Sequence, residues 1–530
     1  MPTEEMTEQT QEKSKNCVVA VDIGTQSIRA IAFDEKGEIK GIRKLEYEPY
    51  FSLRPGWAEK DPLDYWRSLC EVVQGLKEDV GDELWPCLRA VVVTALRDTA
   101  VCLDKKGNVV RPSILWLDQR MASGEPDLGK LGNFVINVAG MKDTLTILYR
   151  KAKSNWLIEN EPETWEKTDK YLQLSGFINY LLTGNYRDSN ASQIGYIPFD
   201  YKNKVWETGK GLKSKLMGIE PSKLPEIVLP GNELGKVTGK AAEETGLPEG
   251  LPVIAGGSDK GCETLGVGCL DETMASISLG TTATIQTTTP RYYEAIRFLP
   301  PYPAVIPGYY NPEIQIFRGY WLISWFKKEF SKKEVIDAER MNIRPEELLN
   351  SRLEEVPPGC DGLVLQPLWS PGILAPKAKG SVIGFGDVHT HTHLYRAIIE
   401  GIGFSLYDGL GKVEKKSGKK VSTVAVSGGG SQSDAICQIT ADIFNRPVKR
   451  VHTHEASGLG AAILGMVGTG VYSTFREALQ NMVHYKDTFM PREKNAKLYQ
   501  DLFHNVFIKI YPRLKGMFDE IQRITNYPQM

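Results

Sequence analysis

The sequence predicts a two-domain α/β protein, and three observations support this fold class. Its 530 residues fill two large domains or three smaller ones, since a domain usually holds about 100–200 residues. Short apolar runs that end in Gly, Ser or Thr turns occur in both halves, and aspartates stand at two of these strand ends. The strand–turn pattern of the first half returns in the second. Enzymes that hold a nucleotide in a cleft between two lobes need this distribution of turns.

The first half is expected to open with a β-hairpin. Residues 17–22 form a short apolar run that ends on an aspartate, a turn follows, and residues 28–34 alternate as a strand does. Pro62 predicts the first turn of a helix, and the β-branched run at 90–95 predicts a buried strand. Residues 150–183 are predicted to be mainly helical, with buried faces at Trp156, Leu157, Ile158, Ile178, Leu181 and Leu182.

The second half is expected to alternate strands and helices. Apolar runs predict strands at 251–255, 274–279 and 421–426, each leading into a Gly-rich turn. The next predicted elements are a helix at about 433–444, a strand that begins near Val448 and a small-residue helix that starts near His454.

The main domain boundary is placed near Asp271, between two of these Gly-rich turns. This gives an N-terminal domain over residues 17–271 and a C-terminal domain with a helical tail over residues 272–530. The polar segment 1–16 is predicted to be a disordered leader, because it has no apolar stretch of the kind that a secretory signal needs.

Composition excludes several classes of protein. Lys and Arg number 64 and Asp and Glu 66, so the net charge of -2 argues against a nucleic-acid binder, which needs a basic surface. No apolar run approaches the roughly 20 residues that span a bilayer, so no membrane partner is expected. The 8 cysteines form no Cys-x-x-Cys pair, and reduced thiols in the cytoplasm are the expected state.

The first candidate site is the turn of the predicted hairpin, Asp22-x-Gly24-Thr25-x-Ser27. A phosphate site needs backbone N–H groups and hydroxyls that converge on an oxyanion, and glycine allows a close approach. A nearby carboxylate can hold a phosphate-bound Mg²⁺. A plain hairpin turn explains the same pattern. The glycine spacing fits neither a Rossmann nor a P-loop motif.

Three further turns carry polar groups at predicted strand ends. Gly256-Gly257-Ser258-Asp259 presents a carboxylate suited to a general base or a metal ligand. Gly280-Thr281-Thr282 is a second turn of the phosphate-binding type. Gly428-Gly429-Gly430 lets the backbone approach a flat ligand such as a purine, although glycine runs also mark linkers.

Taken together, these motifs resemble those of the FGGY carbohydrate kinases from about Cys17 to Tyr472. Phe385, at the end of one matching segment, stands where a smaller aliphatic residue is usual. The segments that carry the resemblance are 21–29, 55–62, 114–120, 256–259, 380–385 with 393–400, and 428–434.

The resemblance implies two ribonuclease-H-like domains of the actin and hexokinase type around a central cleft for ATP and a sugar. It makes Asp259 the general base, and Asp22 and Asp259 the ligands of Mg²⁺. The residues implied around the ATP phosphates are Gly24, Thr25, Gln26, Ser27, Arg29, Gly280, Thr281 and Thr282. Those implied near the adenosine are Gly428, Gly429, Gly430, Ser433 and Asp434.

The resemblance implies a small sugar or polyol as the substrate, and we expect a pentulose such as xylulose. The window Leu96-Arg97-Asp98-Thr99 is closer to glycerol kinases and autoinducer-2 kinases, whereas Trp116-x-Asp118-Gln119-Arg120 is closer to pentulose kinases. Arg97 offers a donor fork and Asp98 an acceptor, which suits vicinal hydroxyls, although a structural ion pair has the same composition. Together with Asp118 and Asp259, these two residues are the predicted substrate ligands.

Lys260 departs from the family pattern, in which Asn or Gln usually follows the catalytic aspartate. A lysine here has three possible roles: it lowers the basicity of Asp259, it points away from Asp259, or it binds an anionic group of the substrate. The last role places Lys260 among the predicted substrate ligands.

Two charged stretches are expected to be less specific. His389, His391 and His393 alternate, which allows a zinc site in a strand, but a polar loop before a helix explains them better. Lys412–Lys420 is expected to be a solvated surface.

The sequence allows a homodimer. The rival class is a non-catalytic sugar or nucleotide sensor, which retention of both Asp22 and Asp259 disfavours.

Overall fold

The predicted hairpin forms from β1 (Cys17–Ile23) and β2 (Ser27–Asp34), which pair in antiparallel fashion. At its turn, the backbone N–H of Gly24 donates to the carbonyl of Ser27 at 3.0 Å. The computed structural model describes residues 16–127, 129, 142–207, 209, 211–370, 375 and 377–527. The predicted disordered leader lies outside these residues, except for Asn16.

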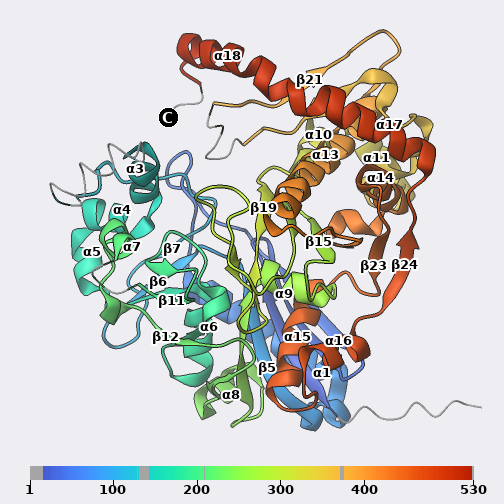
Figure 1. The fold of residues 1–530 in the computed structure, drawn as a ribbon. Helices are drawn as coiled ribbons and strands as arrows, with labels where there is room; N and C mark the ends of the chain where they lie inside the picture. Colours follow the sequence, from blue (N-terminus) through green and yellow to red (C-terminus); the bar gives the residue numbers. More distant parts are fainter. Residues whose placement is uncertain are drawn as a thin grey trace, which may run out of the picture. The chain divides into compact units, whose positions relative to one another are not determined.

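The chain forms two units, each assembled from separated segments. The first contains residues 16–197, 209–256 and 461–482 of the described chain, and the second contains 198–207, 257–460 and 483–527. Each unit has its own six-stranded sheet (Figure 1).

The sheet of the first unit has the order β13-β14-β5-β1-β2-β3. The hairpin continues into β3 (Ile39–Glu46) on one side, and β1 pairs in parallel with β5 (Leu88–Ala95) on the other. Beyond β5 lie β14 (Pro252–Ser258) and β13 (Glu233–Lys236). The predicted strands at 17–22, 28–34, 90–95 and 251–255 are therefore confirmed.

Helices cover both faces of this sheet, which explains why its central strands β1 and β5 are almost entirely apolar and buried. Val19 and Val21 of β1 belong to a core with α1 (Pro62–Leu84) and α6 (Leu174–Thr183). The alternate residue Val18 lies under Gly465 of α15 (Ala456–Gly468). The remaining elements of this unit are β4 (Glu59–Lys60), η1 (Trp85–Cys87), β6 (Ala100–Leu103), β7 (Ser113–Ile114), α3 (Lys142–Lys151), α4 (Lys153–Asn160), α5 (Pro162–Lys167), β8 (Lys170–Gln173), β9 (Arg187–Ser189), η2 (Asn190–Ser192), α7 (Leu212–Met217), η3 (Pro221–Lys223), β12 (Glu226–Val228), α8 (Gly239–Thr245) and α16 (Phe475–Met482).

The sheet of the second unit has the order β19-β16-β15-β22-β23-β24. β15 (Met274–Leu279) pairs in antiparallel fashion with β16 (Ala283–Gln286) and in parallel with β22 (Thr423–Ser427). β22 is parallel to β23 (Val448–Val451), and β24 (Tyr485–Phe489) closes the edge in antiparallel fashion. The strands predicted at 274–279 and 421–426 and near Val448 are confirmed.

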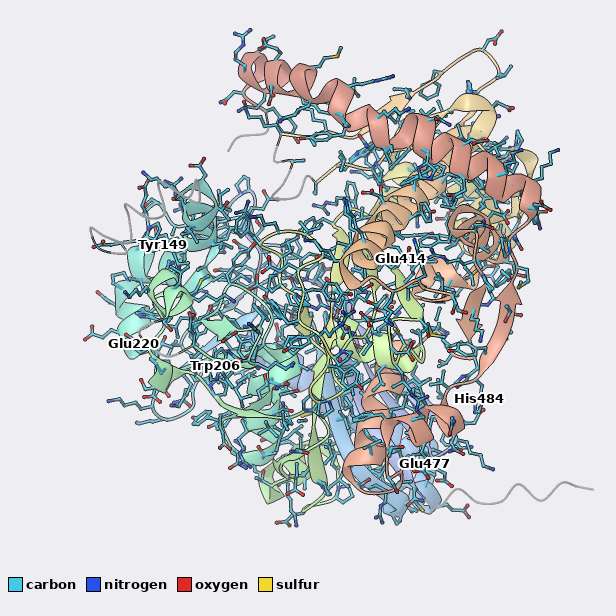
Figure 2. All side chains as sticks on the ribbon, viewed as in Figure 1. Tyr149, Trp206, Glu220, Glu414, Glu477 and His484 are labelled. Atoms are coloured by element: carbon cyan, nitrogen blue, oxygen red, sulfur yellow. The ribbon has the colours of Figure 1, made fainter. Side chains whose placement is uncertain are left out.

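The long helix α13 (His391–Ser417) packs on this second sheet, together with α14 (Asp434–Phe444). At its end, Glu414 accepts from the backbone N–H of Val421 at 2.8 Å and forms an ion pair with Arg446 at 2.9 Å (Figure 2). These contacts join the helix to the strand that follows. The remaining elements of this unit are β10 (Phe199–Asp200), β11 (Val205–Trp206), α9 (Asp259–Gly266), β17 (Tyr302–Pro303), β18 (Tyr310–Asn311), β19 (Glu313–Ile316), α10 (Trp321–Phe330), α11 (Lys332–Met341), α12 (Pro345–Ser351), η4 (Leu353–Glu355), η5 (Cys360–Gly362), β20 (Val364–Gln366), β21 (Ser381–Ile383), η6 (Gly429–Gln432), α17 (Glu493–Leu502), η7 (Phe503–Phe507) and α18 (Ile508–Thr525).

The stretch 150–183 is mainly helical, as predicted, with the short strand β8 between its helices. One detail was wrong: Ile158 is 37 % exposed rather than buried, because the apolar contacts of α4 are made by its neighbours Trp156 and Leu157. No helix in the described ranges is long and apolar enough to cross a membrane.

Candidate active-site residues

The hairpin turn of the first unit holds the first predicted phosphate motif. The Asp22 side chain is 12 % exposed, and its Oδ2 lies 3.5 Å from an Arg29 guanidinium nitrogen on the neighbouring strand. The indole N–H of Trp116 donates to the Thr25 hydroxyl at 3.1 Å, and the hydroxyl of Tyr47 donates to the Gly24 carbonyl at 2.6 Å. The turn is therefore fixed from two sides by residues that the sequence analysis did not assign to the site.

Asp98 follows β5 in the same unit and is held by a buried lysine. Lys153, which is 7 % exposed, pairs with the Asp98 carboxylate at 2.9 Å and donates to its carbonyl. Asp98 adopts a left-handed conformation with φ of 49°, which is uncommon for a residue with a side chain. Backbone strain of this kind clusters at functional sites. Asp98 therefore forms an ion pair with Lys153, a partner that the sequence did not indicate, and an ion pair between Arg97 and Asp98 stays a prediction.

Asp118 lies in a buried network that fixes the segment 114–120. Its side chain is 1 % exposed and pairs with Arg120 at 2.8 Å, and it accepts from the backbone N–H of Ala58 at 2.6 Å. Arg120 also reaches Glu59 at 2.8 Å and stacks 3.8 Å from the ring centre of Trp57. These contacts give Asp118 a supporting role in this segment, and direct contact with a substrate stays a prediction.

Asp259 is the first residue of α9, directly after β14. Its Oδ1 accepts from the backbone N–H of Lys260 at 2.8 Å, and the Ser258 hydroxyl caps the helix by accepting from Gly261 N–H. The positive end of a helix dipole stabilises a carboxylate placed there. Strand β14 extends through Gly256, Gly257 and Ser258, so three of the four residues predicted to form a turn belong to the strand.

Lys260 belongs to the second unit, and its ammonium group contacts Glu263 and Ser278 of the same unit. The distances from Nζ are 2.8 Å to Glu263 Oε2 and 2.6 Å to the Ser278 hydroxyl.

The Gly280–Thr282 turn connects β15 to β16, and its carbonyls at Gly280 and Thr281 accept from the first residues of α10 and its cap. Gly428 has a φ of 80°, and a Cβ there would lie 3.2 Å from the Gly280 nitrogen. Backbone contact between the two glycine turns therefore requires glycine at 428.

The predicted adenosine residues lie at the start of α14. Gly429 and Gly430 form the 3₁₀ turn η6, and Ser433 is the N-cap of the helix. Asp434 is 77 % exposed and pairs with Arg450 at 2.8 Å.

The structure brings the predicted residues together as two groups. The first unit holds Asp22, Gly24 to Ser27, Arg29, Arg97, Asp98 and Asp118, and the second holds Asp259, Lys260, Gly280 to Thr282, Gly428 to Gly430, Ser433 and Asp434. The supporting residues Lys153, Glu263 and Ser427 were missed, because they have partners distant in sequence and no local motif marks them. Trp116 lies in the segment 114–120 that the sequence analysis singled out, but its hydrogen bond to Thr25 was not expected.

The histidines begin a helix rather than a strand. His391 and His393 lie in the first turn of α13, and their partners are Glu334 at 2.8 Å and Asp361 at 3.2 Å. Among the described residues, no group of three or more His, Cys, Asp and Glu is placed to hold a metal ion. His389 precedes the helix, and His391 and His393 lie within it, so the expected polar stretch leading into a helix is confirmed.

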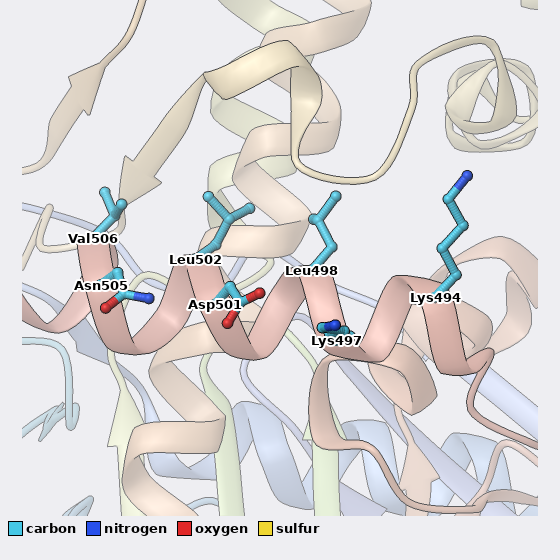
Figure 3. A pocket seen from close by; sticks show the side chains of 7 residues that line it. All are labelled: Lys494, Lys497, Leu498, Asp501, Leu502, Asn505 and Val506. Atoms are coloured by element: carbon cyan, nitrogen blue, oxygen red, sulfur yellow. The ribbon is translucent and has the colours of Figure 1, made fainter.

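One surface hollow of about 530 Å³ lies along α17 and η7 of the second unit (Figure 3). Its lining contains no residue predicted for the site. The lining residues are Lys494, Lys497, Leu498, Asp501, Leu502, Asn505 and Val506.

Comparison with known proteins places the chain in a family. Models of the N-terminal and C-terminal domains of the FGGY family of carbohydrate kinases match residues 17–266 and 275–469. The chain therefore belongs to the FGGY family of carbohydrate kinases. The two α/β domains, of the type shared by actin and hexokinase, and the enzyme class are thereby confirmed: the protein is a sugar kinase that uses ATP as its co-substrate.

The names of the relatives refer to different substrates. A xylulose kinase from Lactococcus lactis is 30% identical over 92% of this chain and 95% of its own. A gluconokinase from Bacillus licheniformis is 26% identical over 96% of this chain and 98% of its own. The crystal structure of xylulose kinase from Rhodospirillum rubrum superposes with a TM-score of 0.79 at 26% identity, over 95% of this chain and 100% of that one.

Proposed function

We propose that this sugar kinase phosphorylates a hydroxyl group of a pentulose such as xylulose, with Asp259 as the general base. The position of Asp259 carries the proposal: its carboxylate stands at the N-terminus of α9, oriented by the Lys260 backbone N–H. The Lys260 ammonium donates to Glu263 at 2.8 Å and to Ser278 at 2.6 Å. The pentulose assignment rests on the segment Trp116–Arg120 and on the xylulose kinases among the relatives.

The proposed reaction is a single in-line displacement. Asp259 accepts the proton of a substrate hydroxyl, and the resulting oxygen attacks the γ-phosphorus of ATP. The new P–O bond forms as the bond from the γ-phosphorus to the bridging oxygen breaks, and ADP leaves with that electron pair. Arg29 and the hydroxyls of Thr25 and Thr281 are assigned to stabilise the charge on the phosphoryl oxygens.

Asp22 is proposed to hold Mg²⁺, with Asp259 as the second predicted ligand. The donor chemistry fits, because Asp22 supplies carboxylate oxygens at a strand end and Mg²⁺ is bound through one or two carboxylates together with substrate phosphates. When bound, the metal supplies neutralisation of phosphate charge.

Arg97, Asp98 and Lys153 are proposed to bind the substrate hydroxyls. A carboxylate held 2.9 Å from an ammonium group accepts hydrogen bonds while its charge is balanced, and Arg97 adds a donor fork. This same set suits glycerol or the acidic sugar gluconate, which keeps a polyol or a sugar acid as the second candidate class.

An assay of ADP release against xylulose, ribulose, gluconate, glycerol and the autoinducer-2 precursor tests the proposal. A pentulose is expected to give the highest kcat/KM. A higher kcat/KM for glycerol or gluconate would transfer the assignment to that substrate. ATP binding without turnover of any sugar would instead support a sensor built on the same fold.

A further inference from the structure

Lys260 occupies an unusual place for a charged side chain. It is the second residue of α9, next to the proposed base, and its side chain is 20 % exposed. Its ammonium group donates to Glu263 Oε2 at 2.8 Å and to the Ser278 hydroxyl at 2.6 Å. Lys260 thus connects the helix that starts with Asp259 to the end of strand β15.

Glu263 extends this connection to a third strand. Its other oxygen, Oε1, accepts from the Ser427 hydroxyl at 2.6 Å, and Ser427 is the last residue of β22. Burial alone would raise the pKa of Glu263. The charge and hydrogen bond of Lys260, together with the two serine hydroxyls, nevertheless hold this pKa below its usual value. Glu263 is therefore a buried anion that depends on Lys260 for its counter-charge.

Both glycine turns begin within two residues of these serines. A Cβ on Gly280 would lie 3.6 Å from the Ser278 hydroxyl and 4.0 Å from Lys260 Nζ, so the ammonium lies beside the Gly280–Thr282 turn. Ser427 immediately precedes Gly428, whose backbone contacts Gly280. Three strand ends, which carry Asp259 and the two glycine turns, therefore share one hydrogen-bonded ion pair.

We propose that the Lys260–Glu263 ion pair is a positioning element, which fixes the Gly280–Thr282 turn for the phosphates of ATP and aligns it with Asp259. This inference rests on the proposed function, which gives that turn its phosphate and Asp259 its proton. Lys260 acts through Glu263 and Ser278 and not as a ligand of the sugar.

The two charges are expected to be coupled in a way that separates positioning from direct phosphate binding. Lys260→Met leaves Glu263 as a buried anion without its cation, and breaking one partner of such a pair is strongly unfavourable. Removing both charges, in Lys260→Met with Glu263→Gln, avoids this and leaves an amide that can still bond to Ser427 and Ser278. A lysine that bound phosphate directly would be lost equally in both variants.

Binding of ATP and of adenosine to the full-length chain tests the inference without using sugar turnover. Lys260→Met is expected to weaken ATP binding about tenfold or more, and the double variant is expected to recover most of that loss. Adenosine affinity is expected to stay within about twofold, because the adenosine turn keeps its own helix cap. Ser278→Ala, which removes one hydroxyl and no charge, is expected to weaken ATP binding by a few fold and guards against misfolding of the charge variants. Lys412→Met, which removes an exposed ion pair with Asp408 in the same unit, is the matched control.

Steady-state kinetics on the same variants give the second readout. Lys260→Met is expected to raise the KM for ATP and lower kcat, with the KM of the sugar unchanged. Equal loss of ATP affinity in the single and double variants would overturn positioning, and so would wild-type ATP affinity in Lys260→Met. A wild-type chain that binds ATP but phosphorylates no sugar would sink the proposed function, while the binding series would still decide the role of Lys260.

Discussion

At the scale of single residues, Asp259 differs from other strand-end carboxylates because the first turn of α9 orients it. Replacing Asp259 with Asn keeps the shape of the side chain and removes its ability to accept a proton. General-base catalysis typically contributes about 10²–10⁴-fold, so kcat is expected to fall by that factor while ATP affinity stays within about twofold. ADP release under saturating sugar and ATP measures the effect.

The control for this substitution is Asp408→Asn, an exposed carboxylate on α13 of the same unit. It is expected to keep wild-type kcat. A fully active Asp259→Asn enzyme would remove the base from the proposed mechanism.

Lys153 is the second residue whose role can be tested alone. Lys153→Met removes the ammonium group 2.9 Å from Asp98 and leaves the carboxylate unbalanced. Losing a buried polar partner costs about 1–3 kcal/mol, so the KM for the sugar is expected to rise by about fivefold or more. The KM for ATP is expected to be unchanged.

The matched control in the same unit is Lys142→Met, whose lysine is 57 % exposed beside Glu125. Thermal unfolding of both variants separates a loss of stability from a loss of sugar binding. An unchanged sugar KM in a folded Lys153→Met chain would contradict a substrate role for the Asp98–Lys153 pair.

At the scale of elements, close helix packing depends on particular glycines. A Cβ on Gly460 of α15 would lie 1.9 Å from the carbonyl oxygen of Cys262 on α9. Gly460→Ala is therefore expected to push the two helices apart and to lower the free energy of unfolding by about 1–3 kcal/mol or more. Urea denaturation followed by circular dichroism measures this change.

Gly411 of α13 offers the opposite case within the same unit. No atom lies within 4 Å of its Cβ position, so Gly411→Ala gains helix propensity without a clash. Stability is expected to rise by about 0.5–1 kcal/mol. Equal effects of the two substitutions would show that helix propensity, rather than the approach of α9 to α15, governs Gly460.

Elements with a dense local signal could be predicted from the sequence. Residues 17–21 are a continuous apolar run and 274–279 an apolar run interrupted only by two serines, and they form the buried strands β1 and β15. The start of α14 was visible in Ser433, which caps it. The exposure of Ile158 was not, since periodicity identifies an apolar face but not the neighbours that cover it.

The candidate site was predictable to the same extent. Its turns were found from glycine and hydroxyl residues that lie together in sequence. Lys153 and Glu263 were not, because their partners Asp98 and Ser427 lie 55 and 164 positions away. A lysine on a helix and a glutamate one turn from the proposed catalytic aspartate look like ordinary surface residues until the fold supplies those partners.

At the scale of the whole molecule, the two sheets repeat one strand order. β3-β2-β1-β5-β14-β13 in the first unit corresponds to β19-β16-β15-β22-β23-β24 in the second. In each, the turn after the first strand carries a predicted phosphate site, at Gly24 or Gly280. The repeated strand–turn pattern of the sequence reflects this shared topology.

One buried carboxyl group, Asp188, makes the free energy of unfolding depend on pH. Burial raises the pKa of Asp188 to about 6, against hydrogen bonds donated by Ser175, Ser189, Gln193 and Asn179. The folded chain therefore binds this proton more tightly than the unfolded chain, whose Asp titrates near pH 4. The sign is that Asp188 lowers stability above pH 6, and this cost disappears as the pH falls from about 6 to 4.

Asp188→Asn removes that titration, and the difference in free energy of unfolding between variant and wild type tests it. The difference is expected to shift in favour of the variant by about 2 kcal/mol between pH 4 and pH 7, since each unit of pKa is worth about 1.4 kcal/mol and part of the change falls below pH 4. Any constant offset reports the rearranged hydrogen bonds, which a rotation of the Gln193 amide can accommodate. Asp104→Asn is the control, because backbone hydrogen bonding from Asn108 lowers the pKa of that exposed carboxyl and gives a dependence of opposite sign. A difference between Asp188→Asn and wild type that stays constant across this range would show that folding does not change the pKa of Asp188.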